Sequence, residues 1–148
     1  MKRFAIALAI FTLTLVSAVA AEKTVKMKDL PPAVQKAVQE QAKGSELKGL
    51  AKEVENGKTY YEAETRINGH GRDILMDQTG AVVEVEEEVT MASLPPAART
   101  AIETRATGGK ITKVESVTKG NVVTYEAAIA KGGKKSEVVV GPDGSVKK

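Results

Sequence analysis

The stretch VVEVEEEV holds the densest run of acidic side chains in this sequence. On a strand, Glu84, Glu86 and Glu88 share one face, while Glu87 lies on the other face among valines. Hard cations need several oxygens that converge on one point. Residues on one face of a strand are about 7 Å apart, so these carboxylates diverge unless another strand contributes. We therefore predict a solvated face that opposes sheet aggregation, and no metal site.

The single histidine, His70, lies between two glycines in the stretch NGHGR. Catalysis or metal binding would need partner side chains, and the sequence has no cysteine and no second histidine. Glu62 and Glu126 each follow a tyrosine, but no nucleophile, base and orienting group can be assembled around them. We predict that His70 is an exposed turn residue and that the protein is not an enzyme, with no catalytic residues and no cofactor.

The first twenty residues have the pattern of a secretory signal peptide. A basic start with Lys2 and Arg3 precedes an apolar run that ends in small residues, and Ala18 and Ala20 fit the cleavage positions. The apolar run is shorter than the roughly 20 residues that a membrane span needs. We expect cleavage after Ala20 and an exported protein, periplasmic or extracellular, with no membrane span afterwards.

Charge and composition exclude nucleic acid as a partner. The formal net charge of +3 includes Lys2 and Arg3, so it falls to +1 when the signal peptide is removed. The chain has no tryptophan and 3% aromatic residues, which leaves few rings on which bases could stack. Without cysteine an exported chain must depend on its hydrophobic core.

The chain aligns with itself without a gap when it is shifted by 64 positions. The motif LPPA occurs at residues 30–33 and again at 94–97, and the downstream glycines and tyrosines also match, as in Tyr61 and Tyr125. We interpret this as a duplicated structural unit, with repeats over residues 21–86 and 87–148.

Each repeat is predicted to open with a helix. Apolar residues after each LPPA motif follow helical spacing, and proline is tolerated in the first turn. Asp29 and Ser93 are the expected N-caps. Gly44 and Gly108 follow at the positions where a left-handed residue ends a helix.

After the helix, the apolar period changes to that of strands. Turn signals such as Asn56-Gly57 and Asn68-Gly69 predict tight hairpins. The expected strands of the first repeat are 46–55, 59–67, 72–76 and 82–91, and the second repeat follows 64 positions later with its last strand shortened to 145–148. The predicted fold class is α+β, with two tandem repeats, each one helix packed on a four-stranded antiparallel meander sheet.

The motifs LPPAV, YYEAE and TYEAA, with glycine-containing turns between apolar strands, resemble tandem PepSY-like domains, the group similar to β-lactamase inhibitor proteins. The resemblance covers almost all of the chain after the signal peptide. It implies an exported protein whose sheet binds another protein or a peptide, and it includes inhibition of a peptidase or other hydrolase among the functions to consider.

Two functions are consistent with these features. The first is a non-enzymatic binding module that engages a protein or peptide through the polar face of its sheet, with Tyr60, Glu62, Glu64, Arg66, Thr124 and Glu126 as the candidate contact residues. Tyr61 and Tyr125 fall on the apolar face and are expected in the core. The alternative is a structural or envelope-stress protein that acts by self-association.

Overall fold

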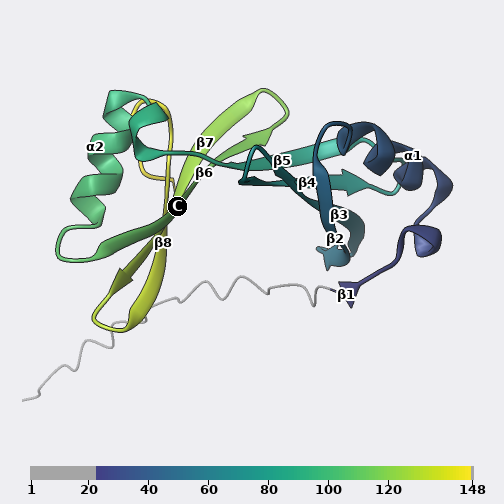
Figure 1. The fold of residues 1–148 in the computed structure, drawn as a ribbon. Coiled ribbons are helices and arrows are strands. Elements are labelled where there is room, and N and C mark those ends of the chain that lie inside the picture. Colours follow the sequence, from purple (N-terminus) through teal and green to yellow (C-terminus); the bar gives the residue numbers. More distant parts are fainter. Residues whose placement is uncertain (1–22, 148) are drawn as a thin grey trace, which may run out of the picture.

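The computed structural model describes residues 23–147, so the predicted signal peptide lies outside the described residues. All strands join one antiparallel sheet in chain order, from β1 to β8 (Figure 1). The strands are β1 Lys23–Thr24, β2 Glu46–Glu55, β3 Lys58–Ile67, β4 His70–Asp77, β5 Val82–Glu88, β6 Lys110–Lys119, β7 Val122–Lys131 and β8 Lys134–Val140. The helices are α1 Pro32–Gln41 and α2 Pro96–Arg105, and each follows a short 3-10 helix, Met27–Asp29 or Met91–Ser93. No helix within residues 23–147 is long and apolar enough to cross a membrane.

Tight turns fix the register of the first two hairpins. Asn56 and Gly57 have φ angles of 50° and 77°, and Asn68 and Gly69 have φ angles of 51° and 84°. Two consecutive residues with positive φ are typical of the two-residue turn whose twist matches that of paired strands. Both hairpins lie where the sequence predicts them. His70 is exposed as predicted, but it is the first residue of β4 and pairs with Ile67, so the prediction of a turn residue is wrong.

The helices begin at the predicted prolines, but the predicted N-caps are wrong. The cap positions are Pro31 and Pro95, and neither makes a side-chain cap hydrogen bond. Ser93 Oγ instead donates to the Thr90 carbonyl within its own 3-10 turn. The reason is the paired proline: a residue before proline is held extended, as Leu30 is with φ −79° and ψ 151°, and this separates Asp29 from the helix.

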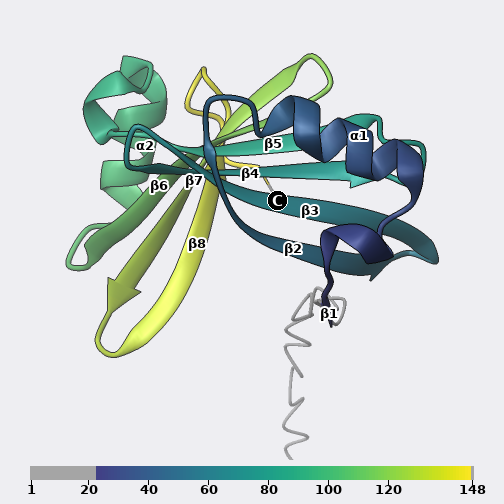
Figure 2. The same ribbon diagram turned by 45° about the vertical axis from the view of Figure 1, so that its right-hand side comes forward.

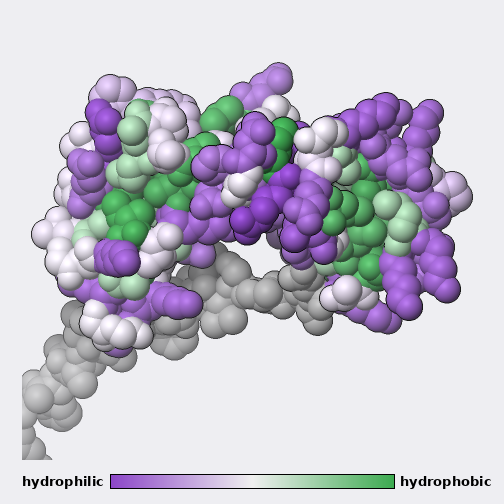
Figure 3. All heavy atoms as spheres, in the orientation of Figure 1, coloured by the Kyte–Doolittle hydropathy of each residue, from purple (hydrophilic) through white to green (hydrophobic). Residues whose placement is uncertain are grey.

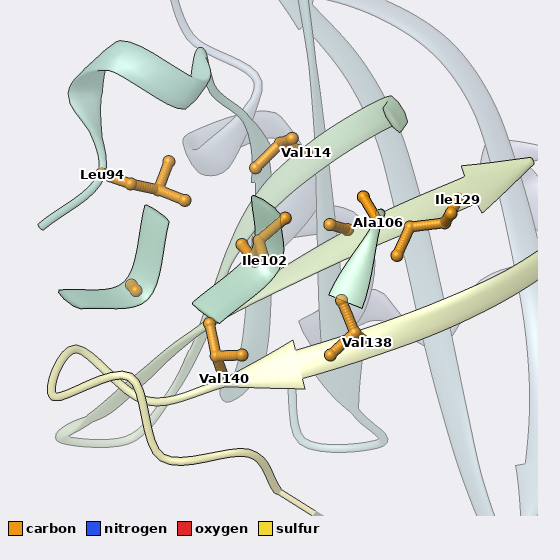
Figure 4. Close-up of a cluster of buried hydrophobic side chains, with 9 residues drawn as sticks. Leu94, Ile102, Ala106, Val114, Ile129, Val138 and Val140 are labelled. Atoms are coloured by element: carbon orange, nitrogen blue, oxygen red, sulfur yellow. The ribbon is translucent and has the colours of Figure 1, made fainter. Parts of the chain in front are cut away.

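Two apolar clusters form the core, one under each helix. Val34 and Val38 of α1 and Ala98 and Ile102 of α2 are fully buried. Figure 4 shows the α2 cluster, in which Ile102 lies among side chains of the helix and of strands β6, β7 and β8. Tyr61 is 8% exposed in the α1 cluster, and Tyr125 packs against the α2 cluster, so both tyrosines contribute to the core as predicted.

Both helices cover the same face of the sheet. Val85 packs against the α1 cluster and lies opposite Thr118 on β6. Thr118 shares a strand face with Val114, which belongs to the α2 cluster. The two helices therefore lie at the two ends of one twisted sheet, and no helix within residues 23–147 covers its other face (Figures 1 and 2).

The order of elements is consistent with the predicted duplication, since α1 and α2, β2 and β6, and β3 and β7 each begin 64 residues apart. Several strand ends differ from prediction. β3 begins one residue earlier than predicted, and β4 spans His70–Asp77 where 72–76 was predicted. β5 stops at Glu88, before the predicted 91, because Met91 begins a 3-10 helix. The predicted last strand is reduced to a single bridge between Val140 and Val146. Pairing of β5 with β6 joins the two halves into one sheet.

Candidate partner-binding site

The face of the sheet opposite the helices carries most of its charged side chains, and we call it the helix-free face. On β3 the side chains that alternate with the buried residues Tyr61, Ala63 and Thr65 point to this face. Through the strand register it comprises Tyr60, Glu62, Glu64 and Arg66 of β3, Asp73 of β4, Glu84, Glu86 and Glu88 of β5, Lys113, Glu115, Val117 and Lys119 of β6, and Thr124 and Glu126 of β7.

All six predicted contact residues lie on the helix-free face, but they form two separate groups. One group is on β3, and the other, Thr124 and Glu126, is on β7. Strands β4, β5 and β6 lie between them, so four strand spacings place the groups about 19 Å apart. Most residues that fill the space between the groups are acids that were not among the predicted contacts, and Lys113, Val117 and Lys119 of β6 lie among them.

Asp73, Glu86 and Glu115 form an acidic cluster at the centre of this face. One carboxylate oxygen from each lies within 4.8 Å of the others, and all three residues are half-buried. Asp73 lies directly opposite Glu86 across the β4–β5 pair, and Glu115 lies on the adjoining strand opposite Glu88. Neighbouring strands thus supply the convergence that Glu84, Glu86 and Glu88 lack along a single strand. The signal that could have found Asp73 is the cross-strand register set by the turn at Gly80.

Crowding of like charges perturbs this cluster. Burial raises the pKa of Glu86 to about 7, and the negative charges of Glu84, Glu115, Glu126 and Asp73 add to the effect. Burial also raises the pKa of Glu126, together with the charge of Glu137 and a hydrogen bond between the two carboxyl groups. A hydrogen bond between two carboxyl groups requires a proton on one of them, which explains the direction of the shift.

Two lysines of β6 form ion pairs with acids of this region. Lys119 Nζ lies 3.0 Å from Glu84 Oε2, and Lys113 pairs with Glu115. Glu86 has no ion pair among the described residues. Four neighbouring acids raise its pKa, while Lys113 and Lys119 attract its charge from β6. Like charges opposite one another in a sheet are unfavourable, so the free protein bears an electrostatic cost that a bound cationic group would reduce.

The chemistry available to this arrangement is the binding of positive charge. Three converging carboxylates can contact a lysine or arginine side chain or a hard metal ion, although calcium takes six to eight oxygen ligands in proteins. The acidic cluster consists of carboxylates alone, with no histidine, serine or cysteine among its members. On the view in Figure 3, hydrophilic residues lie over the middle of the molecule between two more apolar areas.

Comparisons with known proteins give the fold. No protein-family model and no curated protein sequence matches this chain. Among solved structures, it is similar to a protein of Bacteroides eggerthii provisionally described as periplasmic, with a TM-score of 0.68 and 19% identity over 80% of this chain and 86% of that one. It is similar to a DUF2874 family protein of Bacteroides uniformis, with a TM-score of 0.65 and 21% identity over 80% and 86% of the two chains. A BLIP-like protein of Bacteroides fragilis gives a TM-score of 0.60 and 20% identity over 80% and 84%. The chain has the fold of these BLIP-like and DUF2874 proteins.

Proposed function

We propose that this protein is an exported, non-enzymatic binding module that holds a protein or peptide partner against the helix-free face of its sheet. The observation that carries the proposal is the acidic cluster, whose half-buried carboxylates repel one another in the free protein. A lysine or arginine of the partner placed over Glu86 would relieve that repulsion and keep its carboxylate charged near neutral pH.

Three further observations support the proposal. The helix-free face extends over the whole sheet, so it offers an area of the kind that protein interfaces use. The signal-peptide pattern favours export. The fold is shared with a protein described as periplasmic and with a BLIP-like protein. The last similarity extends the proposal to inhibition of a hydrolase as the outcome of binding.

Site-specific photocrosslinking in the native compartment tests the proposal. A photoreactive amino acid replaces Thr124, which lies on the same cross-strand row as Glu86, and in a control it replaces Glu103 on the exposed side of α2. We expect a discrete crosslinked protein from position 124 and none from position 103. The Glu86→Gln change should weaken this crosslink, because it removes the charge that the partner's cation contacts.

The outcomes separate the proposal from its rival. No crosslink at position 124, or equal crosslinks at both positions, would contradict binding at the helix-free face. A product containing two copies of this chain would instead favour the self-associating structural protein. If the captured partner is a hydrolase, its activity measured with and without the purified protein decides whether binding inhibits it.

A further inference from the structure

The outer edge of β8 is paired at one end only. Lys147 N–H donates to the Val139 carbonyl at 2.8 Å, beside the bridge between Val140 and Val146. Backbone groups alternate in direction along a strand, so the N–H and C=O groups of Lys135 and Glu137 face the same outer side as those of Val139. Within residues 23–147, no strand pairs with that side of β8 before Val139.

The corresponding edge in the first half of the chain is filled. β4 begins 64 residues before β8, and it pairs with β5 from Arg72 to Met76. Its pairs are Arg72 with Glu87, Asp73 with Glu86, and Ile74 with Val85. The matching residues of β8 are Ser136, Glu137 and Val138. The pairing of β5 with β4 therefore shows how a further strand could pair with β8. Within residues 23–147, no strand occupies that position beside β8.

A cavity lies beside β8, next to the end of helix α2. It has a volume of about 300 Å³ and is lined in part by Arg105, Ile129, Ser136, Val138 and Val146. Its lining is mixed, because the polar residues Glu137 and Lys147 also border it, and Arg105 comes from the end of helix α2. Its place beside β8 is where a residue of an added strand would lie.

The first half of the chain shows what fills the equivalent space. Arg72 reaches under the end of α1, where Nη1 donates to the Gln41 carbonyl at 3.3 Å, and its Nε lies 3.2 Å from Glu87 Oε1 of β5. In the second half, Ser136 stands in place of Arg72, and Arg105 stands in place of Gln41. The second half therefore carries its arginine at the end of the helix and not on the strand. Within residues 23–147, no acidic side chain pairs with Arg105.

The positive charges near the open edge of β8 favour an acidic segment. Arg105, Lys134 and Lys135 are exposed, and none makes an ion pair among the described residues. Lysines on an edge strand oppose pairing with another basic edge. Acids opposite Ser136 and Lys135 would face Arg105 and Lys135, whereas an acid opposite Glu137 would meet a like charge.

We propose that the outer edge of β8 takes an extended segment of a partner protein, with an apolar residue opposite Val138 and acidic residues opposite Ser136 and Lys135. The segment would add a strand to the sheet, so that main-chain hydrogen bonds to Lys135 and Glu137 hold it and the side chains select it. The site is the backbone edge of β8, although the side chains of Lys135 and Glu137 point to the helix-free face. The proposal does not depend on the function proposed above.

A synthetic hexapeptide with the sequence VTEEVT, blocked at both ends, is the probe. It follows the template of β5, with threonine in the position opposite Glu137. Amide hydrogen exchange followed by NMR reads the result at single residues. At nine-tenths occupancy, exchange at Lys135 and Glu137 should slow about tenfold, because only the free fraction exchanges. The Ser136 amide faces β7 and serves as an internal reference whose exchange should not change.

Matched controls test the charges and the backbone. The peptide VTKKVT should bind roughly tenfold more weakly, since two attractive contacts become repulsive. Arg105→Ala should weaken binding of VTEEVT about threefold, while Arg99→Ala removes the same charge from the same helix and should leave it unchanged. Glu137→Pro removes an outward N–H that β7 does not use, and it should abolish the protection.

Three results would overturn the proposal. The first is unchanged exchange at Lys135 and Glu137 with saturating peptide. The second is equal binding of the two peptides. The third is protection of both amides in the free chain that rises with protein concentration, which would assign the edge to a second copy of this chain.

Discussion

Replacing Glu86 with glutamine should make the protein more stable at pH 8 and leave its stability unchanged at pH 4. The pKa of Glu86 is raised from 4.5 to about 7 in the folded state, chiefly by burial and then by the neighbouring acids. The folded state therefore holds its proton more tightly than the unfolded state between these two pH values. The stability of the unmodified protein should fall as the pH rises through this window, and the variant should lack this component of the fall.

The size of the effect follows from the shift. A difference of about 2.5 pKa units corresponds to roughly 3.4 kcal/mol, since one unit is about 1.36 kcal/mol. Glu86 is only half-buried, so solvent screens its charge, and we expect about 1–2 kcal/mol. Glutamine keeps the shape and hydrogen-bonding capacity of the side chain, and it differs mainly by having no charge to bury.

Urea unfolding of both proteins at pH 4, 6 and 8 measures the difference. Glu103→Gln on the exposed side of α2 is the control for a general change in net charge. Equal stability of Glu86→Gln and the unmodified protein at pH 8 would refute the reasoning, and so would a gain of the same size at pH 4. Either result would mean that the acidic cluster carries no electrostatic cost in the free protein.

Three further outcomes follow from the core and the turns. Ile102→Ala should lower the free energy of unfolding by about 2–5 kcal/mol in urea unfolding, because this fully buried side chain fills the α2 cluster; a loss below 1 kcal/mol would contradict that packing. Gly144→Ala should cost about 2–3 kcal/mol, since φ is +78° and the new Cβ would lie 2.7 Å from the Ala97 carbonyl oxygen. Gly120→Ala, with φ +57° and open space around it, should lower the melting temperature less, and equal losses would contradict the contact with α2. Hydrogen bonds from Thr79 lower the pKa of Asp77, so Asp77→Asn should lose stability relative to the unmodified protein at pH 7, with the difference vanishing as the pH falls through the folded pKa.

Local chemistry made the secondary structure predictable. The turns at Asn56-Gly57 and Asn68-Gly69 need residues that adopt positive φ, and such residues are visible in the sequence. Both helices were predicted, but each cap lies two residues after the predicted one, at Pro31 and Pro95. The side chains of Asp29 and Ser93 are suitable for capping a helix. The helix nevertheless begins later, because the proline after Leu30 holds Leu30 in an extended conformation.

The sequence predicted which side of the sheet the candidate residues occupy, but not how far apart they lie. Alternation along β3 placed Tyr60, Glu62, Glu64 and Arg66 on the same side of the sheet, because side-chain direction has a period of two along any strand. It could not show that β4, β5 and β6 separate these residues from Glu126.

The sequence by itself determined the two helices and the hairpin strands that follow them, the buried stripe of each helix, the position of each tight turn, and the two faces of β3, β5 and β7. These features depend on residues within a few positions of one another. Only the tertiary structure decided that β5 pairs with β6 to make one sheet, that both helices cover the same face, and that Asp73, Glu86 and Glu115 converge. Those outcomes depend on the register between strands, where a shift of one residue would send every side chain to the opposite face.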